Sequence, residues 1–113
     1  MKQIIAYIRP AVLERVTDAL RAIDALSGMS VMEIKGFGQG KGAFCGGERD
    51  MEITHFCKQV RLEIMTSDSI VGEVVDTIRE KAWTGERGEG KIYVLSVEEA
   101  VKIRTNERGE AAV

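Results

Sequence analysis

The segment TGERGEGKIYVL, residues 84–95, is a glycine-rich loop followed by an apolar run. The run 92–95 predicts a strand, and the apolar periodicity of 70–83 ahead of the loop predicts a helix. The loop therefore joins a helix to a strand, the reverse of the order in a P-loop. Glycines between a threonine and a lysine let an anion approach the backbone amides, but ordinary tight turns are built from the same residues. The spacing alone leaves a phosphate loop and a plain connector both open.

The first 37 residues predict a strand, a helix and a second strand. Residues 2–9 are apolar on both faces, which is typical of a strand in the middle of a sheet. Pro10 suits the first turn of a helix, an apolar stripe at helical spacing continues to Leu26, and Gly28 is expected to end that helix. Residues 29–37 then predict the second strand.

Residues 59–65 resume the alternation, with Val60, Leu62 and Ile64 predicted to face the core. The helix at 70–83 and the strand at 92–95 follow, so the order is βαβ, long loop, βαβ. Both helices must cover the same face of one sheet. This pattern predicts a single α+β domain over residues 1–113, a ferredoxin-like split βαβ sandwich (βαββαβ) with a long loop between strands 2 and 3 and a short C-terminal extension.

Composition narrows the range of functions. The chain has 113 residues, and its 18 acidic and 16 basic residues give a net charge of −2, so no overall positive field favours nucleic acid or an anionic membrane. No apolar stretch approaches the roughly 18 residues of a membrane span, and the amino terminus does not resemble a signal peptide. We expect a cytoplasmic protein with no direct membrane insertion.

The segment 38–58 shows no helical period and contains both cysteines and the only histidine. A loop of this length inside a compact domain is typical of a functional segment. Two cysteines are too few for a disulfide framework, so we expect thiols. Cys45, His55 and Cys57 are the candidate metal ligands, but their spacing is looser than in structural zinc sites and favours chance proximity, with redox sensitivity of the thiols as the next alternative.

Three segments resemble, in order, motifs of the PII signal-transduction proteins. GMSVMEIKGFG (28–38) resembles their second strand, TGERGEGKIYV (84–94) their B-loop and fourth strand, and VKIRT (101–105) their C-loop. The resemblance covers nearly the whole chain and includes the length of the long loop, which the family calls the T-loop. We use these names for residues 38–58 (T-loop), 83–91 (B-loop) and 101–108 (C-loop).

The resemblance implies a homotrimer that binds adenine nucleotides in the clefts between subunits. ATP and ADP would compete there, Mg²⁺ can accompany ATP, and the occupant would bias the T-loop, which docks on target proteins. Cations and backbone amides without a general base suit a sensor better than an enzyme. The nucleotide-binding residues implied are Ser30, Gly36, Phe37, Gly38, Thr84, Gly88, Glu89, Gly90 and Lys91, with Lys102 and Arg104 from the adjacent subunit.

The T-loop departs from the family pattern. Usual members carry Arg-Gln-Lys after Gly-Phe-Gly, a modifiable tyrosine further on, and a lysine near the end of the loop. The corresponding residues here are Gln-Gly-Lys at 39–41, Glu52 and Gln59. The missing tyrosine argues against uridylylation. The missing glutamine and lysine argue against binding of 2-oxoglutarate, because in the family these side chains help to hold the effector and its magnesium ion.

Three hypotheses for function follow. The first is a nucleotide-responsive regulator of nitrogen metabolism that acts on an ammonium channel or a nitrogen-assimilation enzyme. The second is a specialised paralogue serving metal efflux or inorganic-carbon transport, with Cys45, His55 and Cys57 as sensing groups. The third is an enzyme acting on nucleotides, which is weakest because the sequence offers no nucleophile beside a base.

Overall fold

A computed structural model describes residues 1–37 and 56–113 of the chain. Four strands and two α-helices make up the described domain, and short 3₁₀ turns precede each helix and follow the last strand. The elements are β1 (Lys2–Ile8), η1 (Pro10–Val12), α1 (Leu13–Arg21), β2 (Ser30–Gly36), β3 (Cys57–Thr66), η2 (Asp68–Ile70), α2 (Val71–Ala82), β4 (Gly90–Ser96) and η3 (Gly109–Ala112).

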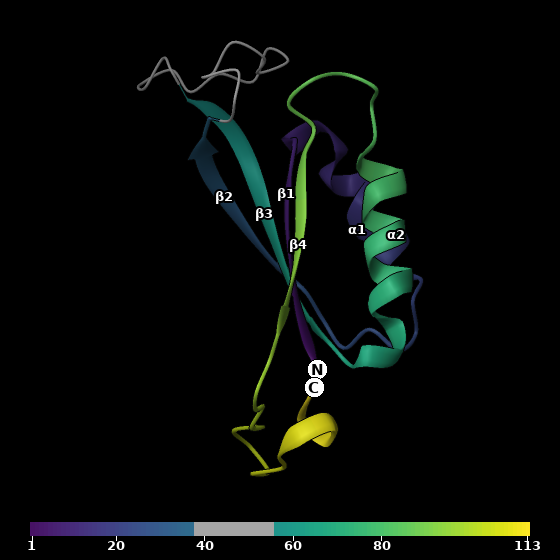
Figure 1. Ribbon diagram of the computed structural model, residues 1–113, viewed down its shortest axis with the longest axis vertical. Helices are drawn as coiled ribbons and strands as arrows, with labels where there is room; N and C mark the ends of the chain where they lie inside the picture. Colours follow the sequence, from purple (N-terminus) through teal and green to yellow (C-terminus); the bar gives the residue numbers. More distant parts are fainter. Residues whose placement is uncertain (38–55) are drawn as a thin grey trace.

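The four strands form one sheet in the order β2-β3-β1-β4, in which all neighbouring strands are antiparallel. Both helices pack on the same face of this sheet (Figure 1). The arrangement is the predicted ferredoxin-like split βαβ sandwich, with β1 in the middle of the sheet as its two apolar faces indicated. Within residues 1–37 and 56–113, no helix has both the length and the apolar character needed to cross a membrane.

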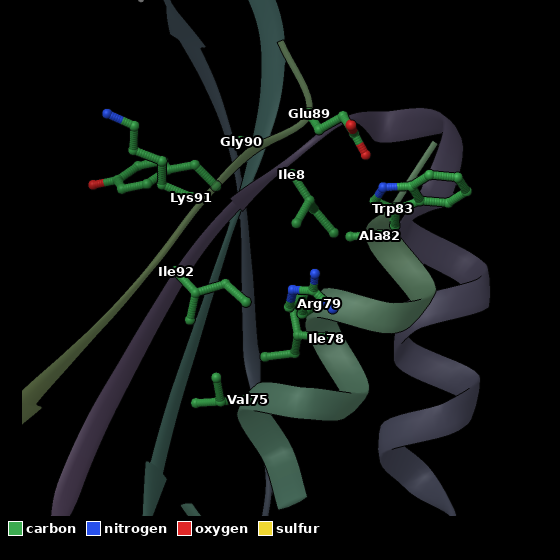
Figure 2. A pocket seen from close by; sticks show the side chains of 11 residues that line it. Ile8, Val75, Ile78, Arg79, Ala82, Trp83, Glu89, Gly90, Lys91 and Ile92 are labelled. Atoms are coloured by element: carbon green, nitrogen blue, oxygen red, sulfur yellow. The ribbon is translucent and has the colours of Figure 1, made fainter. Parts of the chain in front are cut away.

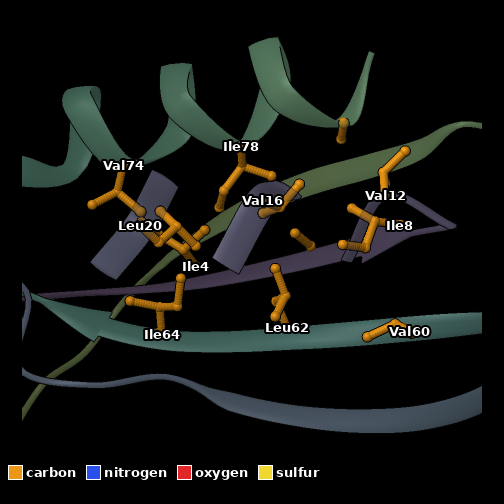
Figure 3. Packing of buried hydrophobic residues seen from close by; sticks show 12 residues of the cluster. Ile4, Ile8, Val12, Val16, Leu20, Val60, Leu62, Ile64, Val74 and Ile78 are labelled. Carbon is orange, nitrogen blue, oxygen red and sulfur yellow. The ribbon is translucent and has the colours of Figure 1, made fainter. Parts of the chain in front are cut away.

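The core lies between the helices and the sheet (Figure 3). Val60, Leu62 and Ile64 face it from β3, as predicted, and Ile4, Ala6 and Ile8 alternate into it from β1. The remaining core residues come from η1 and the two helices, namely Val12, Val16, Leu20, Val74, Ile78 and Ala82.

The opposite face of the sheet is uncovered in the single chain. Met65 is 41% exposed, Leu95 43% and Tyr93 48%. On the same face Arg61 and Glu63 form an ion pair, with the guanidinium nitrogen 2.8 Å from the carboxylate oxygen. Three large apolar side chains on one open sheet face are typical of a surface that another chain covers.

The end of the first helix and the start of the third strand differ from prediction. The first helix ends at Arg21 rather than at Gly28, because bonds from Ile23 N–H to the Leu20 carbonyl and from Leu26 N–H to the Ile23 carbonyl continue the chain in tight turns. Ile23 and Leu26 nevertheless pack against the core. β3 already begins at Cys57, so the last two residues of the predicted T-loop belong to a strand.

The C-terminal segment after β4 leaves the sandwich at the end opposite the connection between α2 and β4 (Figure 1). The ammonium group of Met1 lies 2.8 Å from a carboxylate oxygen of Asp68 and 3.2 Å from one of Glu110. The hydrogen bond to Asp68, and then that to Glu110, raises the pKa of the ammonium, and the bond to the ammonium lowers the pKa of Asp68. These ion pairs join η3 to the sandwich.

Gly90 permits the pairing of β4 with β1. It lies opposite Ile8 in the register, and its φ of 113° belongs to a region that residues with a side chain rarely adopt. A Cβ at this position would lie 1.6 Å from the carbonyl oxygen of Tyr7. Only glycine therefore lets the first residue of β4 approach β1 this closely.

Gly90→Ala is expected to destabilise the fold by at least about 2–4 kcal/mol, because the cost of backbone strain is added to the cost of the clash with the Tyr7 carbonyl. Gly72→Ala is the matched control. A Cβ at Gly72 meets nothing within 4 Å and the residue lies in α2, so alanine should stabilise by roughly 0.5–1 kcal/mol. Urea unfolding at fixed protein concentration measures the change in the free energy of unfolding for both variants. Equal unfolding midpoints for the two variants would contradict this account.

Candidate functional site

The B-loop connects the end of α2 to the start of β4. Two internal hydrogen bonds shape it. A carboxylate oxygen of Glu89 accepts the backbone N–H of Thr84, and the Thr84 hydroxyl oxygen accepts the N–H of Glu86 at 3.2 Å. Thr84 and Glu89, both candidates from the sequence, therefore act on the loop itself in this structure, and their polar side-chain atoms are engaged within it.

Gly88 lies at the exposed tip of the loop with a φ of 81°. Arg87 before it has no positive φ, since Asn106 is the only such non-glycine residue that the structure describes. Residues 87 and 88 form a turn, and successive backbone N–H groups in a turn can make a concavity that binds anions. This turn at the tip of the B-loop is the candidate anion cradle.

Arg9 holds the B-loop from β1, and sequence reasoning missed it. Its Nε donates to the Gly88 carbonyl at 3.2 Å, one terminal nitrogen donates to the Arg87 carbonyl, and the other lies 2.9 Å from the Glu86 carboxylate. The side chain is only 12% exposed. The pairing of Ile8 with Gly90 brings Arg9 to the loop, and no sequence motif indicates that register.

Lys91 and a neighbouring cavity lie on different faces of β4. A cavity of about 400 Å³ separates α2 from β4. Figure 2 shows the Lys91 side chain pointing away from it, while Ile78 and Ile92 line it. The cavity is mostly apolar and borders the B-loop at Glu89; its lining comprises Tyr7, Ile8, Val75, Ile78, Arg79, Ala82, Trp83, Glu89, Gly90, Lys91 and Ile92.

Gly36 and Phe37 lie at the end of β2, at the end of the sheet where the B-loop also lies. The ring of Phe37 packs edge-on against Phe56, with centroids 4.9 Å apart. A Cβ on Gly36 would lie 2.9 Å from the Gln59 side-chain oxygen, so Gln59 covers that glycine. Ser30 lies at the other end of β2, opposite Glu63.

Lys102 and Arg104 lie beyond the far end of β4 from Lys91. Lys102 is held in a turn, with its N–H 2.9 Å from the Glu107 carbonyl, and its ammonium lies 3.5 Å from the Glu107 carboxylate. The seven residues of β4 span about 20 Å at about 3.3 Å per residue. The structure therefore does not bring these two cations to the B-loop of the same chain.

The candidate metal ligands are only partly covered by the structure. Cys45 and His55 lie outside the described residues, as does Gly38, a candidate for nucleotide binding. Cys57 is buried at the start of β3 and is disulfide-bonded, which corrects the expectation of a free thiol at that position. Within 1–37 and 56–113, no three His, Cys, Asp or Glu side chains gather as a metal site.

Comparison with known proteins confirms the resemblance. The family model described as Nitrogen regulatory protein P-II matches residues 1–107. The chain is 42% identical to a nitrogen regulatory protein P-II of Bradyrhizobium diazoefficiens and 41% identical to nitrogen regulatory protein P-II 1 of Escherichia coli (strain K12), over the full length of each. The crystal structure of Arabidopsis thaliana PII bound to citrate matches with a TM-score of 0.79 at 36% identity, covering 99% of this chain and 91% of that one. This chain belongs to the nitrogen regulatory protein P-II family.

Proposed function

We propose that this protein is a cytoplasmic signal-transduction regulator that binds ATP or ADP and controls a partner protein through its T-loop. Family membership supports the regulatory role. The anion cradle at the tip of the B-loop, with Lys91 beside it, supports a phosphate-bearing ligand. The family is described as nitrogen regulatory, and we propose that this chain likewise acts in nitrogen metabolism.

The observation that carries the proposal is the separation of the two halves of the site. The cradle and Lys91 lie at one end of β4, and Lys102 and Arg104 follow its other end. One nucleotide can contact both sets only if a second copy of the chain supplies one of them. The uncovered apolar sheet face supports such an assembly, and we propose a homotrimer with nucleotides between its subunits.

The chemistry of these residues supports binding rather than turnover. Backbone amides and the cations Lys91, Lys102 and Arg104 stabilise phosphate charge by hydrogen bonds and Coulomb attraction. None of them is a nucleophile with an adjacent general base. The Arabidopsis relative is described bound to citrate, a small anion, and we propose that this chain likewise takes a small anionic ligand.

Lys91→Ala is expected to weaken ATP binding by about tenfold to a hundredfold, because a charge-assisted hydrogen bond to phosphate contributes roughly 1.5–3 kcal/mol. Isothermal titration calorimetry measures the affinity. Lys81→Ala is the matched control, since it removes the same charge from the helical face of the domain. If Lys91→Ala and Arg104→Ala both bind ATP as the parent does, the site lies elsewhere.

Mixing two defective variants tests whether the site is shared. Lys91→Ala and Arg104→Ala subunits, each expected to bind weakly alone, should regain parent-like affinity when co-assembled. In a random mixture about a quarter of the clefts would pair an intact B-loop with an intact C-loop from the neighbour. The stoichiometry of tight ATP binding, measured by calorimetry, gives the fraction of clefts that contain both intact loops. Absence of tight sites in mixed trimers, verified by mass spectrometry, would refute a shared site.

The protein is expected to respond to nucleotide but not to micromolar 2-oxoglutarate. Gly40, outside the described residues, offers no side-chain oxygen for magnesium, and Gln59 is neutral where the family has lysine. Losing both contacts lowers affinity by about a thousandfold or more. The test is titration of protein loaded with ATP and Mg²⁺. Saturable micromolar binding would contradict the prediction, and its loss in Lys58→Ala would identify Lys58 as the substitute.

A further inference from the structure

Arg9 is placed to control the backbone of the B-loop rather than to contact a ligand. It follows β1 directly and precedes Pro10, and its backbone (φ −72°, ψ 142°) is in the extended region that a following proline favours. The proline therefore fixes the direction in which the side chain leaves β1. Its three guanidinium nitrogens are all engaged, two by the carbonyls of Arg87 and Gly88 and one by Glu86.

These two carbonyl contacts determine where the neighbouring amides point. The described chain has no cis peptide bond, and in a trans peptide unit the C=O and the N–H point in opposite directions. The Arg87 carbonyl and the Gly88 N–H belong to one peptide unit, and the Gly88 carbonyl and the Glu89 N–H to the next. When Arg9 binds both carbonyls, the N–H groups of Gly88 and Glu89 are turned away from Arg9.

We propose that Arg9 is a positioning residue that orients the Gly88 and Glu89 amides, before ligand arrives, to receive the phosphate groups of a nucleotide. The inference rests on the proposed function, since it concerns the same B-loop. Orienting the amides in advance raises affinity because the loop loses less conformational entropy when the ligand binds. Gly88 contributes its positive φ, and Arg9 fixes the two peptide planes on either side of that residue.

A direct role for Arg9 as a phosphate ligand fits the structure less well. Its side chain is 12% exposed, and its guanidinium donors are turned to the loop's carbonyls and to Glu86. A planar guanidinium can bind two adjacent carbonyls at once, because its donors have a fixed fork geometry. The two contacts to successive carbonyls match that geometry.

The test compares Arg9→Met with Arg15→Met. Arg15 is the matched control because it is also an arginine bound to a backbone carbonyl, with Nε 2.7 Å from the Lys81 oxygen, but it is exposed and lies on α1. Calorimetry with ATP should show at least a tenfold weaker affinity for Arg9→Met and a change within twofold for Arg15→Met. In nucleotide-free protein, trypsin should cut after Arg87 faster in Arg9→Met than in Arg15→Met, at equal melting temperature.

Each outcome separates this inference from the proposed function. If the parent does not bind ATP, the proposed function fails, whereas equal ATP affinity or equal cleavage rates in the two variants overturn only the role of Arg9. If Arg9→Met does not fold, NMR of the parent decides. Addition of ATP should then shift the amide resonances of Gly88 and Glu89 strongly, and unchanged resonances in ATP-saturated protein would overturn the proposal.

Discussion

The pairing of β4 with β1 at Gly90 determines the geometry of the candidate site. The absence of a Cβ lets the backbone of β4 approach the Tyr7 carbonyl at a distance that no other residue permits. That approach sets the register in which Ile8 faces Gly90, and the register in turn places Arg9 beside the preceding loop. The position of the candidate anion cradle thus depends on one backbone contact in the sheet, at the residue that directly follows Glu89.

The same strand also explains why the proposed nucleotide site requires a second copy of the chain. A rigid strand keeps its two ends apart, so the cations that follow β4 cannot fold back onto the loop that precedes it. A site assembled from opposite ends of two subunits makes ligand binding and subunit contact interdependent. The ion pairs of Met1 with Asp68 and Glu110 hold η3 of the C-terminal segment against the sandwich, as the proposed shared site requires.

The sequence predicted the fold well because alternation along β1 and β3 is strong and the helical stripes are regular. It placed Val60, Leu62 and Ile64 in the core, where the structure has them. It missed the end of α1 at Arg21, because the apolar period continues through Ile23 and Leu26 after the helix has changed to tight turns. The role of Arg9 could not be predicted, since it depends on strand register and on backbone carbonyls, neither of which side-chain identity reveals.

The proposed site combines binding by backbone amides with binding by side chains, and the two respond differently to substitution. In the proposed site, phosphate recognition by the Gly88 and Glu89 backbone amides depends on the loop backbone that Arg9 and Gly90 hold in place, and not on the identity of a ligating side chain. Recognition of a second effector, as the resemblance implies it, depends on particular side chains, and Gln59 stands here where the resemblance leads one to expect a lysine. Gln59 instead packs against Gly36 in the described structure. Under the proposed function, nucleotide binding at the B-loop and a second signal at the T-loop therefore rest on different parts of the chain and are separable.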